Sequence, residues 1–147
     1  MQTNDRDPHI FLIEDDNEDI LFFQLAVRSL PFAVLLTTAE NGLRLVEMLE
    51  EALPDVIFLD NFMPYKSGQE CIRDIRSNKK YDSIPIIIYT SHKSPQLAET
   101  SYRNGANLYV LKPKSIRELV EKIQMILKMD WRNSILFQPH GGSELSS

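Results

Sequence analysis

Reactive side chains stand at the carboxyl ends of several short apolar runs in this sequence. They are Glu14, Asp15, Asp60, Thr90 and Lys112. Several carboxylates held close together repel one another and need a compensating cation. A hard divalent ion supplies that charge, and magnesium typically binds a few carboxylates while keeping waters and a phosphate as its other ligands. If the fold brings these residues together, they predict phosphoryl chemistry on a carboxylate.

The apolar runs themselves are predicted to be strands, because they are rich in β-branched, aromatic or leucine residues. They are residues 9–13, 32–38, 55–59, 84–90 and 107–111. Since these runs are apolar at consecutive positions, they favour a parallel sheet that is covered on both faces over a half-exposed antiparallel one. The carboxyl ends of parallel strands meet at one edge of the sheet, and functional residues gather there.

Amphipathic patterns between the strands predict one helix after each strand. In the second helix, Leu43, Val46 and Leu49 are expected on the buried face. Ser115 is expected to cap the fifth helix, and Asn17 is a candidate cap of the first. The fourth helix has the weakest apolar stripe and is expected to be the most mobile. Strands and helices alternate along the chain, which predicts right-handed crossovers and a doubly wound α/β sheet.

Size and composition limit the class of protein. At 147 residues, with 43% hydrophobic and 25% charged residues, the chain fits one globular domain. The net charge of −5 gives no basic face for nucleic acid, and no apolar run approaches the roughly 20 residues that cross a bilayer. The polar N-terminus does not resemble a signal peptide, so a cytoplasmic location is expected. The lone Cys71 excludes an internal disulfide and a multi-cysteine metal site.

Four fragments in order carry a family resemblance. FLIEDD, DVIFLDNFMPYKSG, IPIIIYTS and GANLYVLKP, each at a strand end, resemble the receiver domain of two-component response regulators. The resemblance covers about residues 8–128, which leaves residues 1–7 as a polar N-terminal arm and residues 129–147 as a C-terminal tail. It implies a flavodoxin-like (βα)5 fold with a doubly wound parallel sheet in the strand order 2-1-3-4-5.

The resemblance assigns a metal site and a phosphate acceptor. Asp60 matches the aspartate that accepts the phosphoryl group in this family. Glu14 and Asp15 match the acidic pair that holds Mg2+, directly or through water. Phe62, two residues after the acceptor, would lend its backbone carbonyl to the ion. The implied product is a 4-aspartylphosphate at Asp60.

The resemblance also assigns phosphate-contacting and switch residues. Thr90 matches the switch hydroxyl, and Lys112 matches the lysine that pairs with the acceptor and its phosphate. Tyr109 matches the aromatic switch residue, which would move into space that Thr90 vacates. Pro113 would follow a cis peptide bond, a rare geometry that indicates a fixed structure.

The expected function is that of a stand-alone response regulator in phosphorelay signal transduction. A histidine kinase or phosphotransfer protein would donate the phosphoryl group, and a downstream protein would bind the face made by the fourth helix, fifth strand and fifth helix. The tail of residues 129–147 is too short for an output domain. The chain resembles the small regulators paired with bacteriophytochromes and hybrid kinases. Trp131, Leu136 and Phe137 could form a homodimer surface, and the last tail residues are expected to be disordered.

Other interpretations use the same residues. An aspartyl-phosphate hydrolase carries a second acid two residues after its nucleophile, and Phe62 at that position argues against an enzyme that turns over external substrates. A degenerate receiver that acts only as a scaffold would lack one of the acids or the lysine, and all are present. Asp16 and Asp19 are interpreted as favourable charges at a helix N-terminus. Lys114 departs from the apolar residue usual after Lys-Pro in the family.

Overall fold

Parallel strands form the centre of the protein, whose computed structural model describes residues 6–131. The strands are β1 (His9–Ile13), β2 (Leu35–Ala39), β3 (Val56–Leu59), β4 (Ile86–Thr90) and β5 (Leu108–Leu111). They pair in the order β2-β1-β3-β4-β5, and every pair is parallel. The predicted doubly wound sheet and its strand order are therefore confirmed.

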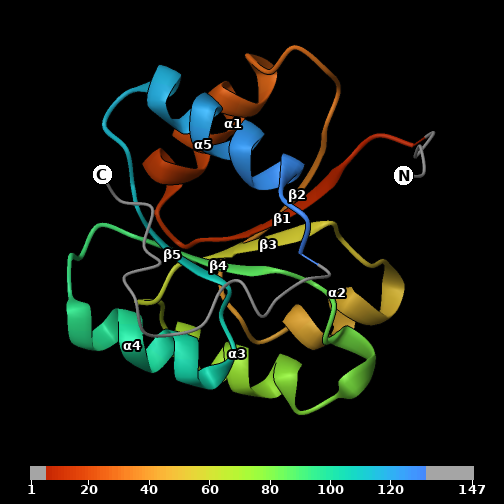
Figure 1. Ribbon diagram of the computed structural model, residues 1–147, viewed down its shortest axis with the longest axis vertical. Coiled ribbons are helices and arrows are strands. Elements are labelled where there is room, and N and C mark those ends of the chain that lie inside the picture. The colour runs from red at the N-terminus through yellow and green to blue at the C-terminus, as the bar shows by residue number, and fades with distance from the viewer. Residues whose placement is uncertain (1–5, 132–147) are drawn as a thin grey trace.

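Helices cover both faces of the sheet. They are α1 (Asn17–Arg28), α2 (Leu45–Glu51), α3 (Gly68–Arg76), α4 (Pro95–Asn104) and α5 (Ile116–Lys128), with a short 3-10 helix, η1 (Lys79–Tyr81), after α3. α1 and α5 lie on one side of the sheet, and α2, α3 and α4 lie on the other (Figure 1). None of the helices within residues 6–131 is long and apolar enough to cross a membrane.

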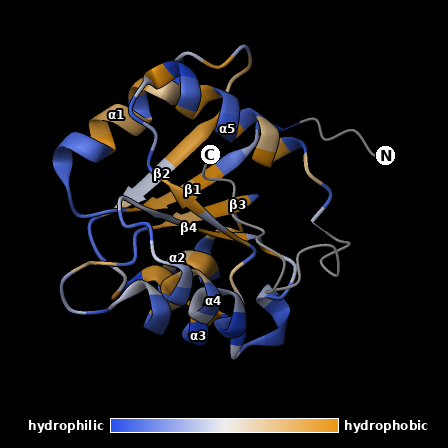
Figure 2. Ribbon diagram, turned by 60° about the vertical axis from the view of Figure 1, so that its left-hand side comes forward, coloured by the Kyte–Doolittle hydropathy of each residue, from blue (hydrophilic) through white to orange (hydrophobic). Residues whose placement is uncertain are grey.

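The sheet separates two apolar cores, because successive side chains of a strand point to opposite faces. Phe11 and Ile13 pack with α2, α3 and α4, whereas Ile10 and Leu12 pack with α1 and α5. Figure 2 shows the apolar strands between helices whose polar surfaces face outward. All four residues of β3 are buried, so the strand that leads to Asp60 is held on both faces.

The second strand and second helix differ from their predictions. β2 begins at Leu35, later than expected, and Leu35 is 56% exposed because β2 is the edge strand and lacks a neighbour on one side. α2 buries Leu45 and Leu49, which lie four residues apart on one helix face, while Leu43 and Val46 are exposed. The prediction is therefore confirmed for Leu49 and wrong for Leu43 and Val46, because the buried face is centred on Leu45.

Side-chain caps define where the helices begin. Ser115 caps α5 as predicted, and Ser67 forms a capping box with Glu70 at α3. The cap of α1 is Asp16 and not Asn17, since the Asp16 carboxylate accepts the backbone N–H groups of the first turn. The predicted high mobility of α4 stays a prediction.

The part of the tail that the structure describes ends at Trp131. Its indole Nε1 donates to the backbone oxygen of Ile126 at 3.0 Å, and its ring packs against the core beside α1 and α5. Leu136 and Phe137, and with them the predicted dimer surface and disordered end, lie outside the described residues.

A half-buried guanidinium connects α3 to the loops around it. Arg76 donates to the backbone oxygens of Gly105, Tyr81 and Ile84 and to Oδ1 of Asn107, at distances of 2.8 to 3.0 Å. Its removal would take a donor from all four acceptors, of which the Tyr81 oxygen and Asn107 Oδ1 would keep the backbone N–H groups of Ile84 and Ile86.

Replacement of this guanidinium should therefore destabilise the fold. We expect Arg76→Met, which keeps most of the side-chain stem, to lower the free energy of unfolding by about 2–4 kcal/mol. Urea unfolding followed by circular dichroism measures this change. Arg73→Met on the exposed face of the same helix is the matched control and should cost less than about 0.5 kcal/mol. Equal losses in the two variants would contradict the assignment.

Candidate functional site

The strand register brings the predicted site residues to one edge of the sheet. Ile13 pairs with Leu59 across β1 and β3, so Glu14 and Asp60 directly follow paired residues. The Asp60 N–H donates to the backbone oxygen of Ile13 at 3.0 Å and fixes this alignment. At the other side, the Lys112 N–H donates to the backbone oxygen of Thr90 at 2.8 Å. The ladder itself therefore positions these side chains.

Three carboxylates form a cluster at this edge. One oxygen atom from each of Glu14, Asp15 and Asp60 lies within 4.8 Å of the other two. Glu14 is fully buried and Asp60 is 7% exposed, whereas Asp15 is exposed and gives the cluster its opening to solvent. This arrangement confines negative charge to a small and nearly dry space.

The ammonium group of Lys112 lies among the carboxylates. Its Nζ is 2.9 Å from Oε1 of Glu14 and 3.6 Å from Oδ2 of Asp60. The shortest contact, 2.7 Å, is to Oδ2 of Asp19 in the first turn of α1. Lys112 is thus held more closely by two neighbouring acids than by Asp60.

Asp19 is a site residue that sequence reasoning missed. We interpreted it as a favourable charge at a helix N-terminus, yet its carboxylate accepts a hydrogen bond from Lys112 across the edge of the sheet. Its position in the sequence could have indicated this role. α1 begins at Asn17, two residues after Asp15, so its first turn lies close to the acidic pair. Asp16, interpreted in the same way, does serve as the helix cap.

Burial and the neighbouring charges shift the protonation of the two central groups in opposite senses. Burial raises the pKa of Glu14 to about 7, with a further increase from the Asp60 charge, although the ion-pair contact with Lys112 opposes both. Burial alone would lower the pKa of Lys112, but its contacts with Asp19 and Glu14 and the charge of Asp60 outweigh burial and raise it. Lys112 is therefore a permanent cation, and Glu14 is a carboxyl group that titrates near neutral pH.

The donor set fits a hard divalent cation. Three carboxylates converge with oxygen atoms only, which is the chemistry that Mg2+ prefers. Oε1 of Glu14 is buried and makes no hydrogen bond, although it lies in the ion-pair contact with Lys112. A buried carboxylate oxygen with spare acceptor capacity, on the inner wall of an acidic cluster, is available to a metal ion.

Phe62 and Thr90 lie beside this cluster. The Phe62 N–H reaches Oδ1 of Asp60 at 3.5 Å, while its 52% exposed side chain packs against the ring of His92 with 4.4 Å between ring centroids. The metal contact predicted for its carbonyl stays a prediction. Thr90 is fully buried, and its Oγ1 accepts the His92 N–H at 3.3 Å.

Tyr109 is buried and directed toward the loop that follows β4. Its hydroxyl donates to the backbone oxygen of His92 at 2.5 Å, and its own N–H donates to the hydroxyl of Tyr102. The ring thus packs inside the fold. The predicted switch role of Tyr109 stays a prediction.

The peptide bond before Pro113 corrects one prediction. Residues 6–131 contain no cis peptide bond, so the Lys112–Pro113 bond is trans. The trans isomer is the lower-energy form of an X–Pro bond, and the backbone contact of Lys112 with Thr90 is made in that form.

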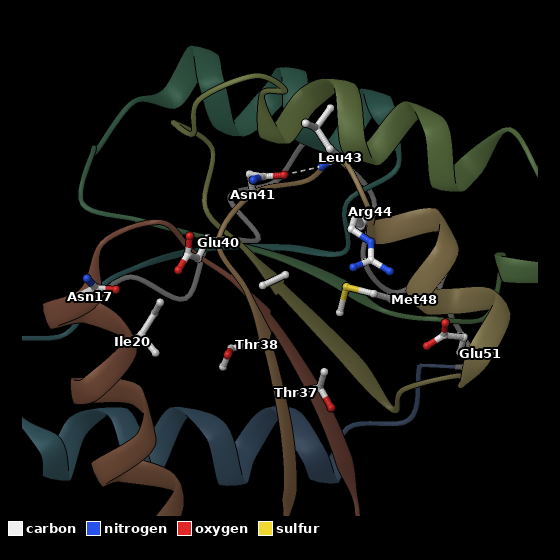
Figure 3. Close-up of a pocket in the computed structure, with 11 residues that line it drawn as sticks. Asn17, Ile20, Thr37, Thr38, Glu40, Asn41, Leu43, Arg44, Met48 and Glu51 are labelled. Atoms are coloured by element: carbon white, nitrogen blue, oxygen red, sulfur yellow. Dashed lines mark hydrogen bonds between the residues drawn. The ribbon is translucent and has the colours of Figure 1, made fainter.

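A separate hollow lies at the free edge of β2 between α1 and α2 (Figure 3). Three of its polar side chains are engaged by their neighbours: Thr37 with His9, Asn41 with the Leu43 N–H, and Arg44 with Glu47. The contact with Glu47 raises the pKa of Arg44, which keeps it a cation.

Comparison with known proteins agrees with this geometry. Residues 10–124 match the family model of the response regulator receiver domain. The hybrid signal transduction histidine kinase D of Dictyostelium discoideum is 32% identical over 128 residues, or 87% of this chain and 8% of that protein. The probable transcriptional regulator ycf27 of Cyanidium caldarium is 31% identical over 144 residues, or 98% of this chain and 56% of that protein. The chain thus spans a minor part of the kinase and about half of the regulator.

A solved structure shows the same fold. The Mn2+-bound form of response regulator Rcp1 aligns with a TM-score of 0.71 and 25% identity, over 81% of this chain and 91% of that one.

The position of Glu14 predicts pH-dependent metal binding. Below a pKa of about 7 the buried Glu14 keeps its proton, so Mg2+ must displace it. We expect the affinity for Mg2+ to rise roughly tenfold between about pH 6 and about pH 8.

The raised pKa also makes ionised Glu14 unfavourable in the metal-free fold. The contribution of Glu14 to the free energy of unfolding therefore falls as pH rises from about 4.5 to about 7.

Calorimetric titration with Mg2+ in two buffers of different ionisation enthalpy measures the released proton. Glu14→Gln should remove the release, and Glu40→Gln, an exposed acid outside the cluster, should keep it. Proton release that persists in Glu14→Gln would contradict this assignment.

Proposed function

We propose, on the premise that this chain belongs to the response regulator receiver domain family, that it accepts a phosphoryl group on Asp60 and signals by an altered protein-binding surface. The observation that carries the proposal is the position of Asp60. Its carboxylate is 7% exposed, and it lies beside an acidic pair and a lysine that come from two other strand ends. Nucleophile, metal ligands and cation meet in one cluster.

The transfer step uses the carboxylate as a nucleophile. An oxygen of Asp60 attacks the phosphorus of a phosphohistidine, the P–N bond breaks, and the imidazole leaves with the bonding electron pair. Since such transfers depend mainly on positioning and charge stabilisation, the fixed backbone of Asp60 is what the fold contributes. Glu14, Asp15 and Asp60, with the Phe62 carbonyl, would hold a Mg2+ ion that neutralises charge on the phosphoryl oxygens.

Lys112 supplies the fixed positive charge of the chain itself. Its Nζ lies 3.6 Å from Oδ2 of Asp60, so a small movement of the side chain would bring the ammonium group to a phosphoryl oxygen. The contacts with Glu14 and Asp19 keep it protonated and directed into the cluster before transfer. The acyl phosphate carries about 1.5 to 2 negative charges in place of the single charge of the carboxylate, and these draw the Lys112 ammonium and the Thr90 hydroxyl toward it.

We propose a histidine kinase or phosphotransfer protein as donor, which would place this chain in the cytoplasm where phosphohistidine is made from ATP. The relative in Dictyostelium discoideum is a hybrid histidine kinase, and the related Rcp1 binds a divalent cation, Mn2+. The output surface would be formed by α4, β5 and α5 and would bind a downstream protein. The stand-alone arrangement and the homodimer stay predictions.

The hydrolase alternative has little support in the geometry. An enzyme that turns over external aspartyl phosphates would place an acid where Phe62 stands. Phe62 packs its ring on His92 and offers no proton-transfer group to Asp60. The scaffold alternative would require a missing acid or lysine, yet the cluster is complete.

Removal of the acceptor carboxylate tests the proposal. We expect Asp60→Asn to abolish labelling by a phosphorylated histidine kinase or phosphotransfer protein, because the amide is not a nucleophile. Phosphotransfer from labelled donor, followed on a gel, measures this. Asp55→Asn at the other end of the β3 segment is the matched control and should label normally. Labelling of Asp60→Asn at the wild-type rate and site would overturn the assignment.

The switch residues predict a separation of phosphorylation from response. We expect Thr90→Val to accept phosphoryl groups but to lose most of the spectral change that beryllofluoride with Mg2+ causes in α4 and β5. The reason is that valine lacks the hydroxyl that would hydrogen-bond to the phosphoryl group. Amide NMR spectra measure that change, with Thr38→Val on the exposed edge strand as control. A Tyr109 ring with one unchanged rotamer in the presence and absence of beryllofluoride would contradict its switch role.

A further inference from the structure

A network of neutral polar side chains lies beside Asp60 and reaches α4. Asn61 directly follows Asp60 and is 5% exposed, and Ser101 of α4 is fully buried. Gln69, in the first turn of α3, joins them: its Nε2 donates to Oδ1 of Asn61 at 2.9 Å and to Oγ of Ser101 at 2.8 Å. Asn104 Nδ2 donates to Oε1 of Gln69 at 2.8 Å. One carboxamide thus connects the acceptor loop to two residues of α4.

The hydrogen bonds of this network run in one consistent direction. The Ser101 hydroxyl donates to the backbone oxygen of Leu97 at 2.7 Å and accepts from Gln69. Gln69 presents its NH2 group to Asn61 and Ser101 and its oxygen to Asn104. All four side chains are buried or half-buried, so each benefits from keeping its partner.

The network is also attached to the backbone of the acceptor. The Gly68 N–H donates to the backbone oxygen of Asn61 at 2.9 Å. A Cβ atom at Gly68 would lie 2.8 Å from both the backbone oxygen of Asp60 and Cα of Asn61, so α3 begins in direct contact with these residues. A displacement of the Asp60–Asn61 peptide is therefore transmitted to Gln69, the next residue of α3.

α4 is attached to the rest of the protein at several points. Its buried residues are Ala98, Ser101 and Tyr102, and the Tyr102 hydroxyl accepts the N–H of Tyr109 in β5 at 3.1 Å. α3 and α4 lie side by side on the same face of the sheet (Figure 1). Arg76 holds the loop at Gly105, where α4 ends, and Gln69 holds Ser101 and Asn104 within the helix. Among these contacts, those of Gln69 join α4 to the loop that carries Asn61.

We propose that Gln69 is a positioning residue that couples the state of Asp60 to the placement of α4, by a route separate from Thr90 and Tyr109. The coupling rests on the proposed function, since Asp60 must change state for α4 to respond. Its parts are the Asn61 peptide, the Gln69 carboxamide and the Ser101 hydroxyl. The groups are uncharged, so the route transmits geometry and not charge.

Hydrogen exchange of the full chain, with and without beryllofluoride and Mg2+, tests this route. In the wild type, beryllofluoride should change the exchange of amides in residues 95–104. Gln69→Met keeps the length of the side chain but removes its hydrogen bonds, and we expect it to reduce this change by about 3- to 10-fold. Beryllofluoride should still bind, as shown by protection of the loop that follows β3.

A matched control and a second variant guard against a loss that is only structural. Gln96→Met replaces an exposed glutamine of α4 and should leave the α4 response intact. Ser101→Ala should reduce the response as Gln69→Met does, and the double variant should lose no more than either single variant, because the residues act as one unit. A purely structural role would lower stability and leave the response to beryllofluoride unchanged.

The possible results separate the two proposals. A full α4 response in Gln69→Met, additive losses in the double variant, or a variant that no longer binds beryllofluoride would overturn the coupling role. A wild-type chain that binds beryllofluoride without any change in α4 would do the same while leaving the acceptor role of Asp60 intact. A wild-type chain that does not bind it would overturn the proposed function, and the coupling with it.

Discussion

The ammonium group of Lys112 offsets part of the negative charge of the carboxylates at the carboxyl edge of the sheet, and the rest of the site depends on this interaction. Lys112 contacts Glu14, Asp19 and Asp60 in a space where water has little access. Attraction and repulsion are both strong there, because nearby solvent cannot screen them. The buried Glu14 resists ionisation for this reason, and Lys112 resists deprotonation. The site thus carries an excess of negative charge on side chains whose positions are fixed, and this combination favours the binding of a divalent cation.

The fixed geometry comes from the sheet. β3 is buried at every residue, and backbone hydrogen bonds tie Asp60 to β1 and Lys112 to β4. A carboxylate carried by such a strand cannot move away from its neighbours to relieve repulsion. Strain from added charge must therefore be relieved by side chains, by a bound cation, or by the loops and helices that follow the strands.

The sequence predicted the part of this structure that follows from local patterns. Apolar runs followed by acids placed Glu14, Asp15 and Asp60 at strand ends, and the order of motifs implied the strand order. The misses share a cause, which is that they depend on three-dimensional neighbours. Leu35 is exposed because β2 lies at an edge, and Asp19 meets Lys112 only because α1 starts above the site. The contact of Gln69 with Ser101 could not be predicted either, since nothing local in the sequence shows that α4 packs against this part of α3.

Charge and geometry give this chain two different ways to respond at Asp60. When all four acids are ionised, one lysine leaves the cluster with an excess of negative charge. Conversion of the Asp60 carboxylate to an acyl phosphate, which carries about 1.5 to 2 negative charges, increases that excess. The charged groups must then rearrange, and how they do so depends on the metal, the pH and the salt concentration. The amide network of Asn61 and Gln69 carries no charge, so under the proposed coupling it follows the position of the Asn61 backbone, which lies after the end of β3. A receiver that uses both would place α4 according to whether the loop after the acceptor has moved, largely unaffected by the ionic conditions that govern the transfer itself.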